Sequence, residues 1–422
     1  IIDHDVTMDG HAPNVNSLVI NSGKTLTGGG YKITLDGENG SGFVITNDGS
    51  ISGNLDLEIN TNGTTSLNIG GSAGNCFRDL KINTATTVLH LHTNTFIDGQ
   101  LTIAAGELRT FTEGNSQRSL TCDGSDISVS SGAQLTINDS QISSRKLTSS
   151  GTLSGTGGNF TVTGAGLGDT TRTIDLGGTV TGDVDITLTG AGNNRHEDLQ
   201  ASGNIRNLTI NNAAAVIHTG RDTTIGGDLT ITAGTLSTDD SGTSVDLTVG
   251  GGIKNTGTLT ANASTIIITG EISGFAFDQM GTFNAGTSTV QIGDGSTSTV
   301  GSSTHFKSNN CHNLIINQHQ DAPNGNVAWR AYTGTEVTIG GNLTVTRGRF
   351  YRNTSTQDLT VTGDVDIASV GQVGTSAASG SNTFGGIRIN SGGTYLATSG
   401  TTTVTNRFTG TSNLWKNDGG TF

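Results

Sequence analysis

The sequence predicts an all-β fold: a single-chain parallel β-helix (β-solenoid) with short strands and turns rich in glycine, asparagine and aspartate. Two observations carry this prediction, a gapless internal repeat and strand-like triplets that recur along the 422 residues. Stacked repeats bury a continuous core that no single repeat could bury alone. The composition agrees, because only 31% of the residues are hydrophobic and 5% are aromatic, which suits many thin strands around a narrow core.

The internal repeat is clearest between residues 79–108 and 207–236, which align without gaps and are identical at 15 of 30 positions. A looser third copy begins with NLIIN at 313–317 and resumes with TIGGNLTVTRGRF at 338–350. We expect the natural protein to extend beyond both ends of this chain. The predicted parts are N-terminal solenoid coils at 1–75 and repeat blocks at 76–204, 205–310 and 311–422, the last with an insertion near 318–335 and continuing beyond 422.

The small unit is a Leu-Thr-Ile or Leu-Thr-Val triplet, as in residues 101–103. Leu and Ile lie two residues apart and share one side of a strand, while Thr points to the other side. Successive triplets are 12 to 20 residues apart (Leu101 to Leu120 is 19), which predicts coils of about 20 residues. The matched Asn83 and Asn211 are expected at corners, where asparagine side chains can form ladders. The segment 195–200, the one that favours a helix, is short.

An alternative fold is a row of β-sandwich modules of about 110 residues, which would match the offsets of 128 and 106 between the NLxIN motifs. Sandwich domains bury several aromatic side chains between two sheets. The low aromatic content of this chain favours the solenoid.

Three phrases, GDLTITAGTL, DLTVTGDVDI and SLVINSGKTLTGGG, resemble the repeats of filamentous-haemagglutinin-like and autotransporter-like bacterial adhesins and of tailed-phage fibre proteins. The resemblance is one of repeat style over nearly the whole chain. It implies an extracellular, cell-surface or virion-associated structural or adhesive rod without catalytic residues. Its partners would be a host or cell-surface glycan or protein receptor, or further copies of itself through end-to-end stacking or a trimer. The alternatives are a β-helix glycan depolymerase (a lyase or hydrolase) and a repeating unit of an extracellular filament or sheath.

Charge and hydropathy argue against a nucleic-acid partner and against a membrane-spanning segment. The net charge is −14, whereas nucleic-acid binding needs a basic face, so we predict no nucleic-acid partner. No run of 18 apolar residues is present, so we predict no membrane span. The three cysteines, Cys76, Cys122 and Cys311, are far apart and are expected to be small buried hydrophobic residues.

Acidic pairs are the candidates for glycosidic chemistry, which uses two carboxyl groups flanking the scissile bond. The pairs are Asp123 with Asp126, Asp183 with Asp185, Asp239 with Asp240, and Asp364 with Asp366. Two of them recur in the same GDVDI string, which favours a scaffold role because an active site is needed only once. We therefore predict no catalytic residue and no cofactor, with structural calcium as a further candidate, although the calcium repeat GGxGxDxUx is missing.

His90 and His92 are weak candidates for metal ligands, because they lie two residues apart on one side of a predicted strand. His218 matches His90 through the offset of 128. No third ligand recurs with them, which favours a corner position of the repeat over a metal site.

The most distinctive candidate binding patch is aromatic and basic. Exposed aromatic rings can stack on sugars, and arginines pair with the carboxylates of acidic glycans. The alternative is local packing of the insertion against the coils. The residues of this patch are Trp329, Arg330, Tyr332, Arg347, Arg349, Phe350, Tyr351 and Arg352.

Overall fold

The strands of a computed structural model stack as parallel sheets in a β-solenoid of about 15 turns, which confirms the predicted fold class. All regular secondary structure in the described residues is β-strand, so none of it is a helix that could span a membrane. The chain divides into two units, residues 1–206 and 207–422. The structure describes residues 1–11, 14–38, 42–164, 172–190, 192–197, 199, 203, 205–296, 303–308, 310–319, 326–330, 336–352, 356–374, 378–410 and 415–416.

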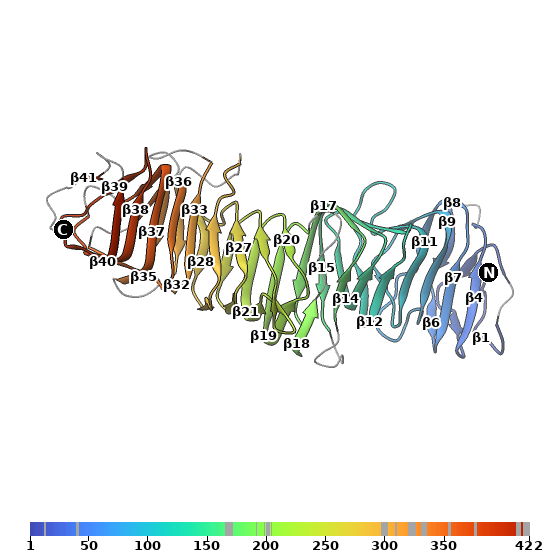
Figure 1. Ribbon diagram of the computed structural model, residues 1–422. Coiled ribbons are helices and arrows are strands. Elements are labelled where there is room, and N and C mark those ends of the chain that lie inside the picture. The colour runs from blue at the N-terminus through green and yellow to red at the C-terminus, as the bar shows by residue number, and fades with distance from the viewer. Residues whose placement is uncertain are drawn as a thin grey trace. The chain divides into compact units, whose positions relative to one another are not determined.

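In unit 1 the coils pass through three faces, and strands of the same face pair in parallel from coil to coil (Figure 1). The third face is interrupted after Ser50–Ser52, which ends a separate three-stranded sheet. Long strands turn a corner and contribute to two faces. The first face contains β4 (Tyr31–Leu35), β7 (Leu55–Ile59), the first parts of β9 (Leu80–Leu91) and β11 (Leu101–Arg109), the second parts of β12 (Leu120–Val129) and β14 (Gln141–Ser149), and β16 (Ile174–Leu176). The second contains β2 (Leu18–Ile20), β5 (Phe43–Asn47), β8 (Gly63–Asn68), the second parts of β9 and β11, β13 (Gln134–Ile137), and the first parts of β15 (Thr152–Val162) and β17 (Thr179–Leu188). The third contains β1 (Val6–Thr7), β3 (Thr25–Thr27), β6 (Ser50–Ser52), β10 (Thr95–Phe96), the first parts of β12 and β14, and the second parts of β15 and β17.

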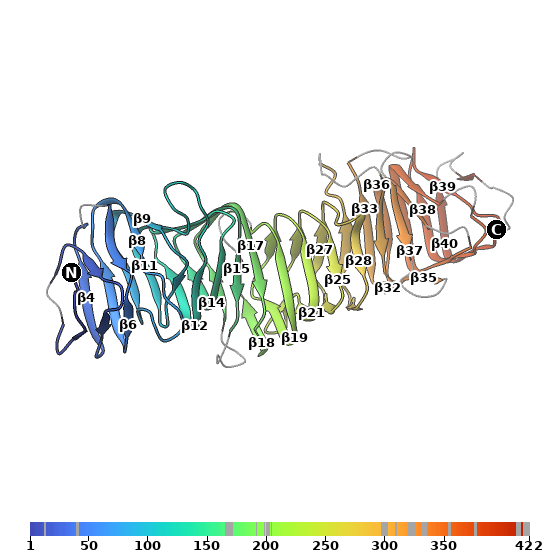
Figure 2. The same cartoon turned by 180° about the vertical axis from the view of Figure 1, so that it is seen from behind.

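Unit 2 has the same three-faced organisation. Figure 2 shows its stacked strands from β25 to β40. Its first face contains the first parts of β19 (Leu208–Thr219) and β21 (Leu229–Ser237), then β25 (Ile253–Asn255), β28 (Phe275–Gln279), β31 (Ser303–Lys307), β34 (Asn326–Arg330), the ends of β36 (Leu343–Arg352) and β37 (Asp358–Val373), β39 (Thr394–Leu396) and β41 (Trp415–Lys416). The second contains the ends of β19 and β21, β26 (Thr258–Thr260) and β29 (Thr282–Asn284), and further along the chain β32 (Asn310–Cys311), β35 (Glu336–Ile339) and the first parts of β37, β38 (Asn382–Ile389) and β40 (Thr402–Gly410). The third contains β20 (Thr223–Ile225), β24 (Leu247–Val249), β27 (Thr265–Ile268), β30 (Thr289–Ile292), β33 (Asn313–Asn317), the first part of β36, the middle of β37 and the ends of β38 and β40.

The core of each unit is a column of stacked aliphatic side chains. In unit 1 Leu57, Leu80, Leu101 and Ile127 pair in register from coil to coil, and each is at most 1% exposed. Each fully buried side chain of this kind contributes about 1.5–3 kcal/mol of transfer free energy. The parallel pairing between coils also shows that the alternative of tandem β-sandwich modules is wrong.

Most coils are longer than the predicted length of about 20 residues, although the coil from Ile127 to Leu147 matches it. Leu101 pairs with Ile127, whereas Leu120 pairs with Thr95 and Ile142 on another face. Neighbouring triplets in the sequence therefore belong to different faces, so the distance between them does not measure the length of a coil. The coils also vary in length, since the pair of Ile127 with Leu147 spans a much shorter segment than the pair of Leu314 with Leu343.

Side-chain ladders form at the residue before a triplet rather than at the predicted corner asparagines. Asn313 Oδ1 accepts a hydrogen bond from Asn342 N at 2.9 Å, and Asn342 Oδ1 accepts one from Asp364 N at 2.8 Å. A Cβ at Gly341 or Gly363 would lie 2.3 or 2.2 Å from these oxygens, so glycine makes room for the ladder. Other steps run from Asp5 to Thr25, Asp79 to Gln100, Asn207 to Asp228, Asp228 to Gly252, Asp222 to Asp246, Asp246 to Thr265, and Asp358 to Ser381.

Asn83 and Asn211 do lie at corners, because the pairing register shifts beside each of them. The Asn83 side chain donates to Glu58 Oε1 at 2.9 Å instead of to another asparagine. Lys32 and Lys81 also contact Glu58, and hydrogen bonding from Lys32 outweighs desolvation to hold the pKa of Glu58 below its usual value.

Within the segment expected to favour a helix, residues 195–197 belong to a strand instead, β18 (Gly192–Glu197). Glu197 is fully buried, and its carboxylate accepts hydrogen bonds from the backbone N–H groups of Thr173 and Ile174 at 2.8 and 2.6 Å. This tertiary pairing outweighs local helix propensity. The three cysteines are free and buried, as predicted.

Candidate functional site

The acidic pairs of unit 1 face arginines of the next coil. Asp126 Oδ1 lies 2.7 Å from Arg145 Nε. Arg206 lies between Asp183 and Asp185, at 3.3 Å from the first carboxylate and 2.6 Å from the second. These arginines occupy carboxylate oxygens that an acid or base catalyst would present to a sugar.

The pair in unit 2 is arranged in the same way. Arg388 Nη2 lies 2.7 Å from Asp366 Oδ2, and Arg407 Nη2 lies 3.4 Å from Asp364 Oδ2. Such partly exposed pairs contribute only about 0–1 kcal/mol each. They mainly balance charge between neighbouring coils. The side chains of Asp123 and Asp240 lie outside the described part of the structure.

The two histidines predicted as weak metal ligands lie in different surroundings. His90 is 4% exposed, and its Nδ1 lies 3.1 Å from the carbonyl oxygen of Phe111. His92 is exposed, and its ring meets the ring of Phe43 edge-on at 5.0 Å. Among the described residues, no group of three or more His, Cys, Asp or Glu side chains could hold a metal ion.

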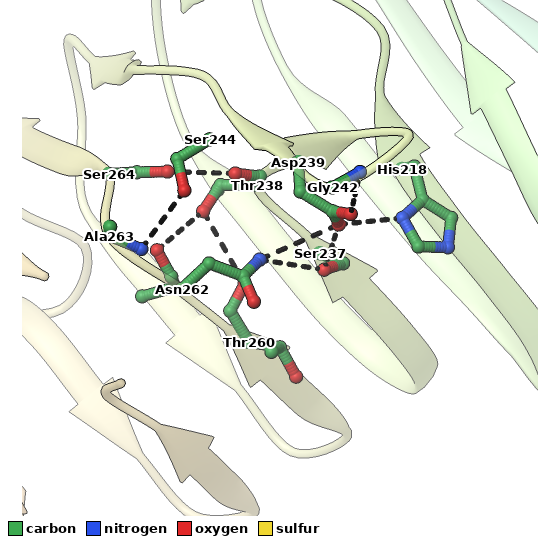
Figure 3. Close-up of polar contacts among 11 residues, drawn as sticks. His218, Ser237, Thr238, Asp239, Gly242, Ser244, Thr260, Asn262, Ala263 and Ser264 are labelled. Atoms are coloured by element: carbon green, nitrogen blue, oxygen red, sulfur yellow. Dashed lines mark hydrogen bonds and ion pairs between the residues drawn. The ribbon is translucent and has the colours of Figure 1, made fainter. Parts of the chain in front are cut away.

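His218, which matches His90 in the repeat, belongs to a polar cluster at a β-hairpin (Figure 3). The hairpin is formed by β22 (Asp239–Asp240) and β23 (Thr243–Ser244). Asp239 Oδ1 accepts hydrogen bonds from His218 Nδ1 at 2.7 Å and from Ser237 Oγ at 2.5 Å. Asn262 Nδ2 donates to Ser237 Oγ at 3.0 Å and closes the cluster.

Ser237, Asp239 and His218 have the residue types of a hydrolytic triad but not its geometry. In a triad the histidine lies between serine and aspartate and accepts the serine proton. Here the aspartate is central, and the serine hydroxyl points to the carboxylate. Burial raises the pKa of Asp239, but the hydrogen bonds from Ser237 and His218 outweigh it, so its pKa lies below its ordinary value. The cluster anchors the hairpin.

The predicted aromatic and basic patch separates onto two sides of β36. Phe350 is fully buried and Arg352 is 5% exposed, so both face the interior. The Arg352 guanidinium donates to the carbonyl oxygens of Gln357 and Ser381, and burial lowers its pKa. These two side chains support the coil and are not presented to a ligand.

Arg349 and Tyr351 lie on the outward side of β36. The Arg349 guanidinium lies 5.2 Å from the centre of the Tyr351 ring, and its Nε donates to the carbonyl oxygen of Gly374 at 3.0 Å. Arg347 donates to the carbonyl oxygen of Gly295 at 3.4 Å. The backbones of Trp329 and Arg330 lie in β34, but their side chains, and all of Tyr332, fall outside the described residues.

The pairing register extends this outward surface with residues that the sequence reasoning missed. Phe275 pairs with His305, His305 with Ala328, and Ala328 with Tyr351. The rings of Phe275 and His305 lie 5.3 Å apart, and both residues are half-buried. We call Phe275, His305, Arg349 and Tyr351 the aromatic stripe. Its members come from strands far apart in the sequence, β28 to β36, so only the coil register brings them together.

Comparison of the chain with protein-family models, with curated proteins and with solved structures finds no match.

Proposed function

We propose that the chain is a structural and adhesive segment of an extracellular, cell-surface or virion protein, with no catalysis of its own. The observation that supports this most is the pairing of outward carboxylates with arginines of the next coil, as for Asp185 with Arg206 and Asp366 with Arg388. These charges serve the stacking of coils, which favours a scaffold role over glycan hydrolysis.

The adhesive part of the proposal rests on the aromatic stripe. With a strand spacing of about 4.8 Å, its three steps cover roughly 14 Å, which suits a short stretch of an extended glycan. Half-buried rings can stack on sugar faces, and the Arg349 guanidinium can donate hydrogen bonds to hydroxyl or carboxylate oxygens. We propose a host or cell-surface glycan as the partner of this surface.

The test is binding of the full chain to an array of cell-surface and capsular glycans. We expect the double variant Phe275→Ala and Tyr351→Ala to lose at least tenfold in apparent affinity for the glycans that the original chain binds. Phe408→Ala is the matched control, because Phe408 is an aromatic residue of unit 2 that is 46% exposed on another face. Unchanged binding by the double variant would refute the stripe as the adhesive surface.

Incubation with the same polysaccharides tests the absence of catalysis. We expect no new reducing ends and no unsaturated sugars, measured by reducing-sugar assay and by ultraviolet absorbance. Cleavage that persists in the purified chain would replace the structural proposal with a glycan depolymerase.

A further inference from the structure

A hollow of about 440 Å³ opens beside the hairpin that joins β11 to β12 in unit 1. Small-molecule sites typically have volumes of about 300–1,000 Å³. Its lining combines aromatic, hydroxyl, acidic and basic side chains. The principal ones are Phe43, Ser66, His92, Glu113, Ser116 and Arg118.

The hollow exists because this connection is unusually long. Ten residues separate β11 from β12, whereas three separate β13 from β14 at the same corner of the next coil. The strands keep their register, so the additional residues fold outward as a hairpin, with Phe111 and Gln117 bridged and Asn115 at a positive φ of 61°. His90 holds the base of this hairpin through Phe111.

Arg118 is held in position at the edge of the hollow. Its Nε donates to the carbonyl oxygen of His92 at 2.7 Å, and its Nη1 donates to that of Gln117 at 2.8 Å. Within the described residues, no carboxylate lies within ion-pair distance of Arg118, and its Nη2 has no protein partner. All the other arginine side chains in the described part of unit 1 pair with carboxylates: Arg78, Arg109, Arg145, Arg172 and Arg206.

This exception points to an anionic ligand. The chain carries a net charge of −14. Among the described residues, even so, no carboxylate forms an ion pair with the guanidinium of Arg118. A guanidinium held in place binds a carboxylate with strong, directed hydrogen bonds. Glu113 also lines the hollow. Its negative charge repels a doubly charged phosphate, or several sulfate groups, more strongly than a single carboxylate, so a single carboxylate is the favoured ligand.

The remaining lining residues suit a polyhydroxylated ring. The rings of Phe43 and His92 are nearly perpendicular, at 86°, and form an aromatic corner. Ser66, which is 7% exposed, presents a hydroxyl group, and Glu113 and Ser116 add polar groups to the lining. Such mixed surfaces place apolar C–H groups against rings and hydroxyl groups against polar atoms.

We propose that this hollow binds a carboxylated sugar, a hexuronic acid residue, with its carboxylate on Arg118 and its ring against Phe43 and His92. The site lies in unit 1 and does not depend on the aromatic stripe of unit 2. It takes one sugar residue, supplied either as a free monosaccharide or as part of an acidic polysaccharide.

Calorimetric titration of the full chain with glucuronate, oligoglucuronate and glucose tests the proposal. We expect glucuronate or its oligomer to bind at least tenfold more tightly than glucose, since the carboxylate contact is charge-assisted. Arg118→Gln should remove this preference. Arg145→Gln, which breaks an ion pair with Asp126 outside the hollow, should leave the affinity within twofold.

The proposal would be overturned if neither glucuronate nor oligoglucuronate bound, or if glucose and glucuronate bound with equal affinity. If the Arg118→Gln variant fails to fold, a second measurement uses the original chain: the nuclear magnetic resonance signals of its histidine imidazoles. Glucuronate should shift those of His92, which lines the hollow, more than those of His90, which is buried under the hairpin. Equal shifts, or none for His92 at saturating sugar, would also contradict it.

Discussion

The hairpins at residues 110–119 and 238–246 grow from equivalent corners of the two best-matched repeat blocks. A histidine holds each of them: His90 Nδ1 lies 3.1 Å from the Phe111 carbonyl oxygen, and His218 Nδ1 lies 2.7 Å from the Asp239 carboxylate. The residue pairs are related by the same offset of 128. The repeat therefore keeps the anchoring contact even though its partner changes from a backbone carbonyl to a carboxylate.

The bases of the two hairpins are also alike. Ser140 Oγ donates to the carbonyl oxygen of Thr110 at 2.8 Å, and Ser264 Oγ donates to that of Thr238 at 2.7 Å. All four residues are buried. The next coil thus supports each hairpin by the same bond.

The tips differ, and the difference decides whether space remains. In unit 2, Asp239 gathers Ser237, His218 and Asn262 around one carboxylate (Figure 3). In unit 1 the position of Asp239 is taken by Phe111, the hairpin is one residue longer, and it borders a hollow. The same corner of the repeat can therefore present either a closed polar cluster or an open hollow.

The largest expected effect comes from removing the aromatic anchor of the unit 1 hairpin. Phe111 is 6% exposed, and the centre of its ring lies 5.6 Å from the centre of the His90 ring. Phe111→Ala should therefore lower the local free energy of opening of the hairpin by about 3 kcal/mol. Hydrogen exchange of the Arg118 amide, which bonds to the Thr110 carbonyl oxygen, measures this. Phe111→Leu is the control and should cost less than about 1.5 kcal/mol. Equal losses for both variants would show that the ring is not the anchor.

Removal of the carboxylate anchor in unit 2 should have a somewhat smaller effect. Asp239→Ala leaves the donors of His218 and Ser237 without their acceptor, so the hairpin should lose about 2 kcal/mol. Faster exchange of the Val245 amide, bonded to the Thr238 carbonyl oxygen, reports it. Asp222→Ala, at an exposed ladder position of the same unit, serves as the comparison. A loss no larger than that of Asp222→Ala would assign the hairpin's stability to its backbone alone.

Acid should open the unit 2 hairpin through the same carboxylate. The pKa of Asp239 is lowered in the folded state, so its stabilisation is fully present above the ordinary value of 3.8. It is lost as the pH falls from 3.8 through the lowered pKa. We expect the exchange of the Val245 amide, corrected for intrinsic rates, to rise in that range and Asp239→Asn to abolish the rise. An unchanged pH profile in Asp239→Asn would attribute the transition to another group.

The smallest expected effect on stability is that of Arg118→Gln, because Arg118 bonds only to two carbonyl oxygens. We expect the free energy of unfolding to change by less than about 0.5 kcal/mol, measured by denaturant unfolding. Arg206→Gln, which breaks a double ion pair at a comparable exposure, is the matched variant. A loss well above that of Arg206→Gln would make Arg118 a structural residue of the hairpin.

Much of the fold was predictable because its signal is local. The Leu-Thr-Ile triplet gives one buried and one outward side per strand, and the repeat requires these sides to stack, as for Leu80 with Leu101. The coil length was not predictable, because Leu101 and Leu120 are alike in sequence yet belong to different faces. The surfaces proposed for binding were harder still to predict from the sequence. Alternation along β36 separates Phe350 from Tyr351, but the partners of Tyr351 depend on the length of every intervening coil.

The sequence by itself determined an all-strand chain with an aliphatic interior, because side-chain alternation and repetition act over a few residues. Only the tertiary structure decided which outward residues become neighbours. Parallel pairing fixes each strand against a strand of the next coil, as Ile127 against Leu147 and Leu314 against Leu343. Connections of variable length set that register, and the same connections, folded outward, create the hollow beside Arg118 and the closed cluster around Asp239.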